Sequence, residues 1–242
     1  MQYTLPPELI VSDWLDRFGV LAVFGDNSIP YRHFLDNPDT IQISNFKLTP
    51  TELLRCKQTH SDLVHIVSRD DAGAGIVIGK PYIPLVDGFI SNHKGLFPIA
   101  VSADCTPILI LAPDVEVVVA VHSGRVGTEK NILGKTLTRM IVEFGANPKT
   151  ICLKTGPAIC EDHYPVDEKT HSEFVKNTGV TQRYPNLDMR KVLLKQAMDT
   201  GLLAENIEIS PVCTLEHSSY SSYRENKTRE RQINFIGYPK DI

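Results

Sequence analysis

The sequence predicts a mixed α/β (α+β) protein, a layered sandwich with a large central mixed sheet. Strand-length apolar runs recur through the middle of the chain, and three later segments change to the helical period of 3.6 residues. Helices and strands are interspersed without a strict βαβ repeat, which argues against an all-parallel sheet. The 242 residues show no repeat, low-complexity tract or linker, so we expect a single domain over residues 1–242.

The predicted elements before the helical segments are mostly short strands. Residues 1–50 contain Gly, Pro and Asn breakers and are expected to form short strands and loops. Residues 49–56, in which Thr49-Pro50 precedes TELLRC, are predicted as one or two capped helical turns. Apolar runs predict strands at residues 63–68, 75–79, 87–91, 99–101, 108–111 and 115–121. The last run is nearly all Val and Ala, as is typical of a strand buried on both faces.

The second half of the chain carries the helical segments. Apolar residues between 128 and 144 fall on one helix face, and Gly145 supplies the stop. Residues 167–177 and 187–200 are further helix candidates. Between and after them, strands are predicted at residues 150–154 and 207–210 and at the end of the polar tail.

Composition excludes several classes of protein. Hydrophobic content of 42%, charged content of 22% and a formal net charge of −4 are typical of a globular protein with no electrostatic preference for nucleic acid or membrane surfaces. The N-terminal segment lacks the pattern of a signal peptide, and no apolar run approaches the roughly 20 residues that a bilayer span needs. We therefore expect a cytoplasmic protein.

Five cysteines are present, but they do not predict a disulfide framework. Their number is odd, their spacings are wide and no CxxC occurs. Cys56, Cys152 and Cys213 are predicted to be small buried hydrophobic residues. Cys105 differs, because polar Asp104 precedes it and Thr106-Pro107 follow it.

One thiol and two imidazoles lie at the ends of apolar runs. Cys105 and His122 are separated by one apparent hairpin, and His60 lies on a third segment. If the fold brings them together, they form either a metal site or a Cys-His catalytic pair. Two histidines, one thiolate and an open fourth position suit catalytic zinc. The alternative is that each is a satisfied polar residue at a strand edge, and no HExxH, CxxC or HxH pattern decides between these readings.

Five ordered motifs carry a family resemblance. ADCTPILI and VAVHSGRVGT resemble the ADCxPVLL and AVHAGWRGT signatures of the YfiH-type laccase-domain family, also labelled multicopper polyphenol oxidases. QTHSDLVHIV is similar to its QVHGxxVxxV, and DGFISNHKGLFPIAV to its ADALVTxxPGLALAV. GPAICEDHYPVDEK resembles GPAIGPxCYEVGxE, and SYRENKTRERQINFI resembles SYRRDxxTGRxAxxI. The match covers residues 60–236, whereas the first 50 residues match weakly.

The resemblance implies a function and a set of site residues. His60, Cys105 and His122 fall on the family's zinc-binding positions, in a pocket of a layered α/β domain. The implied chemistry is phosphorolysis of adenosine, inosine or methylthioadenosine, together with deamination of adenosine. The implied partners are therefore a purine nucleoside and phosphate, with Gly124 and Arg125 near the substrate and Arg224 in or beside the pocket. We expect a monomer or homodimer.

The chain departs from the family pattern at several pocket positions. Arg125-Val126 stand where the family has Trp-Arg, so a stacking surface and a candidate phosphate clamp are lost. In the tail only Arg224 remains of a usual Arg pair, Glu230 replaces a glycine, and His163 stands where Cys is frequent. Substrate preference is therefore expected to differ, and phosphorolysis to be weaker.

Other readings of the same residues stay open. Cys105 and His122 would equally suit a Cys-His hydrolase or deamidase, with the thiol as nucleophile and the imidazole as base. A metal-binding protein without turnover is a further alternative. A copper phenol oxidase ranks last, because the eight histidines show none of the HxH clusters that such copper sites use. Zinc is accordingly expected in preference to copper.

Overall fold

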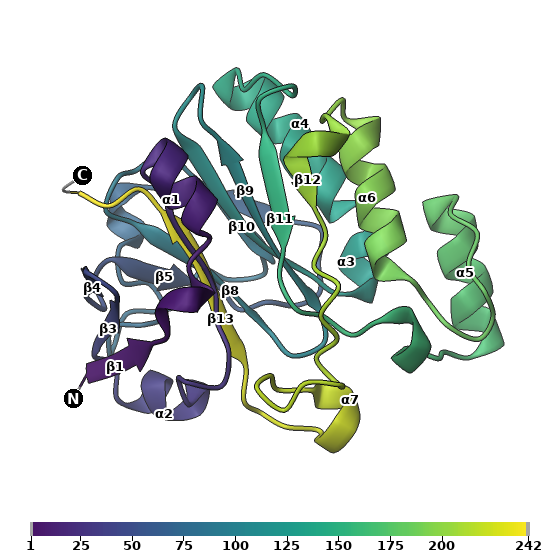
Figure 1. Ribbon diagram of the computed structural model, residues 1–242, viewed down its shortest axis with the longest axis horizontal. Helices are drawn as coiled ribbons and strands as arrows, with labels where there is room; N and C mark the ends of the chain where they lie inside the picture. The colour runs from purple at the N-terminus through teal and green to yellow at the C-terminus, as the bar shows by residue number, and fades with distance from the viewer. Residues whose placement is uncertain (1, 241–242) are drawn as a thin grey trace.

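The computed structural model describes residues 2–240 and confirms the mixed α/β class (Figure 1). Three sheets and a helical layer follow one another. The three-stranded sheet has the order β1-β3-β4, the four-stranded sheet β2-β13-β8-β5 and the six-stranded sheet β12-β11-β9-β10-β7-β6. Each of the three contains both parallel and antiparallel pairs.

The strands of the described chain have the following bounds: β1 (Gln2–Leu5), β2 (Leu21–Phe24), β3 (Thr40–Ile43), β4 (Phe46–Leu48), β5 (Leu53–Arg55), β6 (Val64–Ile66), β7 (Gly88–Ser91), β8 (Phe97–Ser102), β9 (Thr106–Ala112), β10 (Val117–Ser123), β11 (Cys152–Thr155), β12 (Ile207–Glu208) and β13 (Gln232–Gly237). The helices are α1 (Ser12–Phe18), α2 (Tyr31–Asp36), α3 (Arg125–Glu129), α4 (Ile132–Phe144), α5 (Glu168–Thr178), α6 (Met189–Asp199) and α7 (Tyr223–Asn226).

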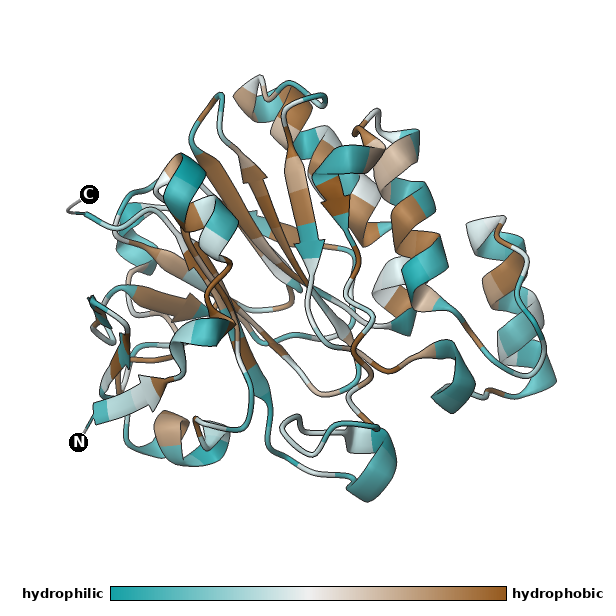
Figure 2. Cartoon of the chain, viewed as in Figure 1, coloured by the Kyte–Doolittle hydropathy of each residue, from teal (hydrophilic) through white to brown (hydrophobic). Residues whose placement is uncertain are grey.

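The core is layered because the central strands are apolar on both faces. In β10, Val117, Val119 and Val121 pack toward α4 and α6, whereas Val118 and Ala120 pack toward the four-stranded sheet. The four-stranded sheet in turn packs its other face on the three-stranded sheet. Figure 2 shows the result, with hydrophobic strands in the interior and helices around them that carry both hydrophobic and hydrophilic residues. Successive side chains of a strand point to opposite faces of the sheet, so one apolar strand contributes to the core on both sides.

Most predicted elements are confirmed with small shifts at their ends. The strands predicted at residues 63–68, 87–91, 99–101, 108–111, 115–121, 150–154 and 207–210 are β6 to β12, and β13 is the predicted strand of the tail. The helices predicted at 167–177 and 187–200 are α5 and α6. The helical segment at 128–144 is divided, because Asn131 adopts a left-handed φ of 64° and caps α4 with its side chain.

Three predictions for the first 80 residues are wrong. Residues 49–56 do not form helical turns, because Leu53 and Leu54 are buried in β5, which pairs with β8. Residues 75–79 form turns in place of a strand, since Gly75 and Gly79 both have positive φ. The first 50 residues contain α1 and α2 as well as strands, with Trp14 and Phe34 as their buried anchors.

Two of the three predictions of buried cysteines are confirmed. Cys56 and Cys213 are buried as expected, whereas Cys152 is only partly buried beside the core between the two larger sheets.

No helix within the described residues combines the length and hydropathy needed to span a membrane.

Candidate functional site

Three loops and strand ends bring His60, Cys105 and His122 together. His60 lies between β5 and β6, Cys105 in the turn that joins β8 to β9, and His122 near the end of β10. Because β9 and β10 are antiparallel neighbours, with His122 opposite Pro107, the thiol and this imidazole meet at one sheet edge. His60 Nε2 lies 3.7 Å from Cys105 Sγ, and the two imidazole centroids are 4.9 Å apart. The three donor atoms lie within 4.8 Å of one another.

The fully buried carboxylate of Asp87 organises this group from behind. It accepts hydrogen bonds from the backbone N–H of Thr59, His60 and Ser61, at 3.1, 3.0 and 2.6 Å. It also lies 2.9 Å from His122 Nδ1, which places a donating N–H on that atom and leaves Nε2 free as a ligand atom. Burial alone would raise the pKa of Asp87, but the hydrogen bonds from His122 and Ser61 outweigh it and lower the pKa to about 2.

Unusual backbone conformations accompany the site. His60 has a φ of 60° and Asp104, which precedes Cys105, a φ of 79°. Non-glycine residues rarely adopt this left-handed region, and such strain persists where the surroundings enforce it. The bonds to Asp87 hold the first, while Asp104 is held by bonds that its carboxylate accepts from Thr214 Oγ1 and the Arg224 N–H, at 2.7 and 2.6 Å.

The thiol of Cys105 favours its ionised form in the metal-free protein. Burial would raise its pKa, but the neighbouring imidazoles of His122 and His60 outweigh burial and lower it to about 6. Burial alone would lower the pKa of His122. The neighbouring Cys105 and Asp87 outweigh burial, so that the pKa of His122 is raised. A thiolate is the form of cysteine that binds a metal and also the form that acts as nucleophile.

Gly124 follows the strand that carries His122 and lies against the group. A Cβ atom at this position would stand 2.5 Å from His60 Cδ2 and 3.2 Å from Cys105 Sγ. Any larger residue would displace the imidazole or the thiol. Only glycine therefore fits at position 124 without moving His60 or Cys105.

The group opens into a pocket of about 680 Å³. Arg125 and Arg224, which the sequence singled out, line it together with the three donor residues. Six basic side chains line the pocket and only one carboxylate, that of Asp104; the basic ones are Arg55, Lys57, Arg125, Arg224, Lys227 and Arg231. Among these six, Arg125 forms an ion pair with Glu129, in which Nη1 lies 2.9 Å from Oε2. The pocket is therefore suited to an anionic ligand.

Arg224 is placed by both aromatic and polar contacts. Its guanidinium carbon lies 5.0 Å from the ring centroid of Tyr164, and Nη1 donates to the Pro165 carbonyl at 3.3 Å. Tyr164 itself lines the pocket. Within residues 2–240, the Arg224 guanidinium forms no ion pair with a carboxylate, and its side-chain contacts are those with Tyr164 and the Pro165 carbonyl.

The donor set fits a single metal ion better than a multicopper centre. Imidazole and thiolate ligands are those of zinc, and one donor of the set, His122, is oriented by a carboxylate as zinc-bound histidines usually are. A multicopper centre would need further histidines nearby. Within residues 2–240, the only other group of His, Cys, Asp and Glu side chains with metal-binding spacing contains one histidine.

Comparison with known proteins identifies the family. The model of the family described as multi-copper polyphenol oxidoreductase laccase matches residues 35–239. The chain belongs to this family. The expected resemblance to the YfiH-type laccase domain is thereby confirmed.

Relatives and solved structures agree with this assignment. A protein of Corynebacterium glutamicum named purine nucleoside phosphorylase is 29% identical over 220 residues, which is 86% of each chain. The crystal structure of the hypothetical protein YfiH from Bacillus licheniformis has the same fold, with a TM-score of 0.83 over 94% of this chain and 95% of that one, at 22% identity. YlmD from Geobacillus stearothermophilus has a TM-score of 0.75 at 26% identity, and the match covers 80% of this chain and 76% of YlmD.

Sequence reasoning assigned no role to two residues that shape the site, although both stand in the motifs that carry the family resemblance. Asp87 and Asp104 each receive hydrogen bonds from distant segments, and neither is a candidate ligand by its spacing. The sequence does contain one indication for Asp87, which directly precedes a fully buried strand. A carboxylate at such a place needs several hydrogen-bond donors around it, and so it is expected to organise its neighbours.

Proposed function

We propose that this protein is a zinc-dependent purine nucleoside phosphorylase that also deaminates adenosine. The observation that carries the proposal is the His60–Cys105–His122 group opening into a cationic pocket. Relatives that carry the name purine nucleoside phosphorylase support the substrate class. Adenosine, inosine and methylthioadenosine are the proposed nucleosides, with phosphate as the second substrate.

The side chains divide the work between metal and anion. Zinc held by His60, Cys105 and His122 would supply Lewis-acid polarisation and activate water for deamination. Asp87 keeps the proton of His122 on Nδ1, so that Nε2 faces the group. Arg224 holds phosphate against the ribose, because its charge stands free in the pocket and is oriented by Tyr164.

The departures at Arg125-Val126 weaken the phosphate site. Val126 lines the pocket but carries no charge, and the Arg125 charge is shared with Glu129. One lost charge-assisted contact to an anion costs on the order of 2–3 kcal/mol, or roughly 30–150-fold in rate if it forms in the transition state. Phosphorolysis should therefore be slower here than in relatives with Trp-Arg, whereas deamination, which uses no phosphate, is spared.

The proposal is tested by product analysis. Metal-loaded protein is incubated with adenosine or inosine, with and without phosphate, and bases and nucleosides are separated by chromatography. We expect phosphate-dependent release of base, and inosine from adenosine in either condition. Arg224→Gln should raise the KM for phosphate about 30-fold or more, whereas Arg229→Gln, an exposed neighbour outside the pocket, should not.

The double variant Arg125→Trp, Val126→Arg addresses the departure directly. It should accelerate phosphate-dependent base release and leave deamination unchanged. Absence of any product from every nucleoside, in protein that holds one zinc at His60–Cys105–His122, would refute the proposed activity.

A Cys-His hydrolase is the second candidate, and one observation favours it. Asp87, His122 and Cys105 stand in the order carboxylate, imidazole, thiol that activates a cysteine nucleophile. Iodoacetamide separates the two functions. A zinc-bound Cys105 should resist alkylation while the nucleoside activity persists, whereas a hydrolase should be alkylated there and lose its activity.

A further inference from the structure

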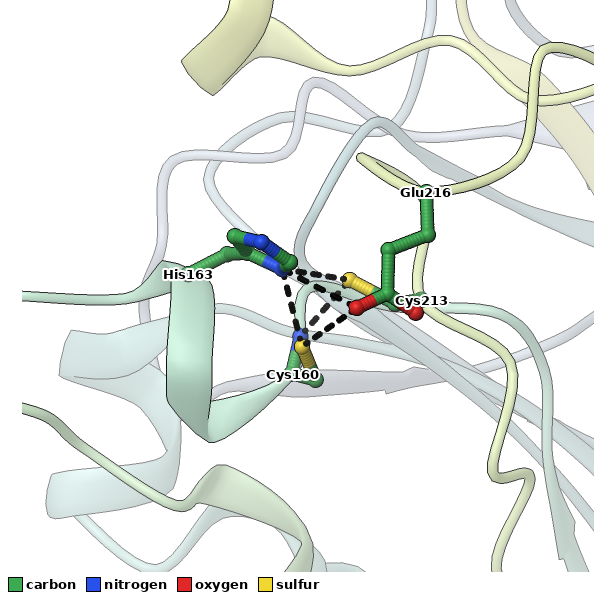
Figure 3. Close-up of side chains that lie close together, drawn as sticks. All are labelled: Cys160, His163, Cys213 and Glu216. Carbon is green, nitrogen blue, oxygen red and sulfur yellow. Dashed lines mark hydrogen bonds and ion pairs between the residues drawn. The ribbon is translucent and has the colours of Figure 1, made fainter.

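A second cluster of metal-binding side chains lies outside the described pocket. Figure 3 shows Cys160, His163, Cys213 and Glu216 pointing toward one another. Cys160 directly precedes the short 3-10 helix Glu161–His163 and His163 ends it, whereas the other two lie in the loop that precedes α7. Each pair is separated by two residues, a spacing that lets one turn of chain present two ligands to the same point.

The spacing of the four donor atoms suits a tetrahedral ion. His163 Nδ1 lies 3.1 Å from Cys160 Sγ, 3.5 Å from Cys213 Sγ and 3.4 Å from Glu216 Oε1. Cys160 Sγ lies 3.9 Å from Glu216 Oε1. Ligands about 2.0–2.3 Å from a tetrahedral zinc ion stand about 3.3–3.8 Å from one another. The observed separations bracket this range.

The backbone around the cluster is fixed without the help of an ion. Ala158 and Cys213 form a parallel β-bridge, and the Arg190 guanidinium donates to the carbonyls of Ala158 and Val212, at 3.2 and 2.8 Å. The Cys160 N–H donates to Cys213 Sγ at 3.3 Å, the kind of bond that stabilises a metal-bound thiolate. Cys213 is 1% exposed, so this ligand is shielded from water, whereas the Glu216 side chain is 55% exposed and lies on the solvent side of the cluster.

A disulfide or an isolated reactive thiol accounts for this arrangement less well. Both sulfur atoms contact the same imidazole nitrogen, and a carboxylate oxygen lies beside the same nitrogen. Two thiols, one imidazole and one carboxylate that converge on a single point make up the ligand set of a divalent cation such as zinc.

We propose that Cys160, His163, Cys213 and Glu216 form a second zinc site, separate from the His60–Cys105–His122 group. The site has a structural role, because all four positions for ligands are filled by side chains. It joins the segment that ends in Tyr164 to the loop that holds Thr214. Since Thr214 bonds to Asp104, the residue before Cys105, the second ion would stabilise one wall of the pocket.

The experiment counts zinc in reduced protein and in matched variants. The wild type should hold two zinc ions per chain. Cys213→Ser and Cys105→Ser should each lower this to one, and the double variant should hold none. Cys152→Ser, which alters a partly buried cysteine outside both groups, should retain two. One zinc in the wild type that Cys105→Ser abolishes and Cys213→Ser spares would overturn the second site.

Cobalt substitution tests the ligands without relying on the stability of a Cys213 variant. Co²⁺ titrated into Cys105→Ser protein should give thiolate charge-transfer absorption about twice as strong as in Cys213→Ser protein, because two thiolates bind in one site and one in the other. Glu216→Gln should weaken zinc at the second site about 10-fold or more while His60–Cys105–His122 retains its ion. A Cys160–Cys213 disulfide found by mass spectrometry in reduced, zinc-supplied protein, or no cobalt absorption from Cys105→Ser, would contradict the proposal.

Discussion

At the scale of single residues, one buried carboxylate determines the geometry of the candidate metal group. Asp87 binds the backbone on both sides of His60 and the ring of His122, so that two of three donors depend on it. Ionised carboxylates are rarely buried unless several donors stabilise them. The charge-assisted bonds therefore serve both the fold and the orientation of the ligands.

Asp87→Asn should weaken zinc binding at His60–Cys105–His122 about 10–100-fold. The amide presents one acceptor oxygen in place of two, so the N–H groups of residues 59–61 lose part of their acceptor and His122 loses its charged partner. Competition with a chromophoric chelator measures the affinity, and Asp16→Asn on the exposed side of α1 is the control. Unchanged affinity in folded Asp87→Asn protein would show that the carboxylate does not orient the group.

Gly124→Ala should also reduce zinc occupancy at this group, without a change of charge. The new Cβ would stand 2.5 Å from the ring of His60, a separation that real contacts do not allow, so the imidazole must move. Zinc content and the urea midpoint are measured together, which distinguishes a displaced ligand from a damaged fold. Full occupancy would mean that the loop carrying His60 adapts to the methyl group.

At the scale of elements, the central strands of the six-stranded sheet were predictable because they are apolar and buried on both faces. In β9 and β10 every residue is buried, so an apolar run of strand length suffices to locate them. The helical turns predicted for residues 49–56 were wrong because the local sequence pattern and the tertiary pairing disagree there. Thr49 does form local bonds with Glu52, as at a helix start, but pairing of Leu53 with Phe97 then draws the chain into β5.

The candidate site was predictable to the same extent. His60, Cys105 and His122 interrupt or end apolar runs, and such placement is visible in a sequence. Asp87 and Asp104 act through hydrogen bonds to residues up to 120 positions away, and no local pattern encodes such partners. The second cluster depends in the same way on the bridge between Ala158 and Cys213, which joins distant segments.

The turn after β6 provides a pH-dependent contribution to stability. Burial would raise the pKa of Asp71, but the Ser68 N–H and His65 outweigh it and lower this pKa. Asp71 and Ser68 also form a capping box for the 3-10 helix Arg69–Asp71. A depressed folded-state pKa means that the stabilisation is present above the ordinary aspartate pKa of about 3.9 and is lost as the pH falls through the folded value.

Asp71→Asn should accordingly destabilise the protein by about 1 kcal/mol at pH 7 and by clearly less at pH 3. Urea unfolding of wild type and variant at both pH values measures the difference, with exposed Asp70→Asn as the control. An equal loss of stability at both pH values would show that the packing of Asp71, and not its charge, is responsible.

At the scale of the whole molecule, the candidate site lies where two sheets and a loop layer meet. His122 comes from the six-stranded sheet, Val101 from the four-stranded sheet and Arg224 from the helix that precedes β13, and all three line the same pocket. A chain with a net charge of −4 thus places six basic side chains around one pocket. Such segregation concentrates anions locally against the sign of the net charge.

If this segregation serves the binding of phosphate, the KM for phosphate should rise several-fold when NaCl increases from about 10 to about 150 mM, because the Debye length falls from about 30 to about 8 Å. Deamination of adenosine, which needs no anion, should change little over the same range. Lys227→Gln should reduce the dependence on salt by removing one of the six charges, whereas Arg229→Gln in the same loop should leave it unchanged.

A phosphate KM that is independent of salt would mean that the basic side chains act only through direct contacts or that their charges serve another ligand. Equal salt dependence in the Lys227 and Arg229 variants would instead assign the effect to the field of the whole surface and not to the pocket.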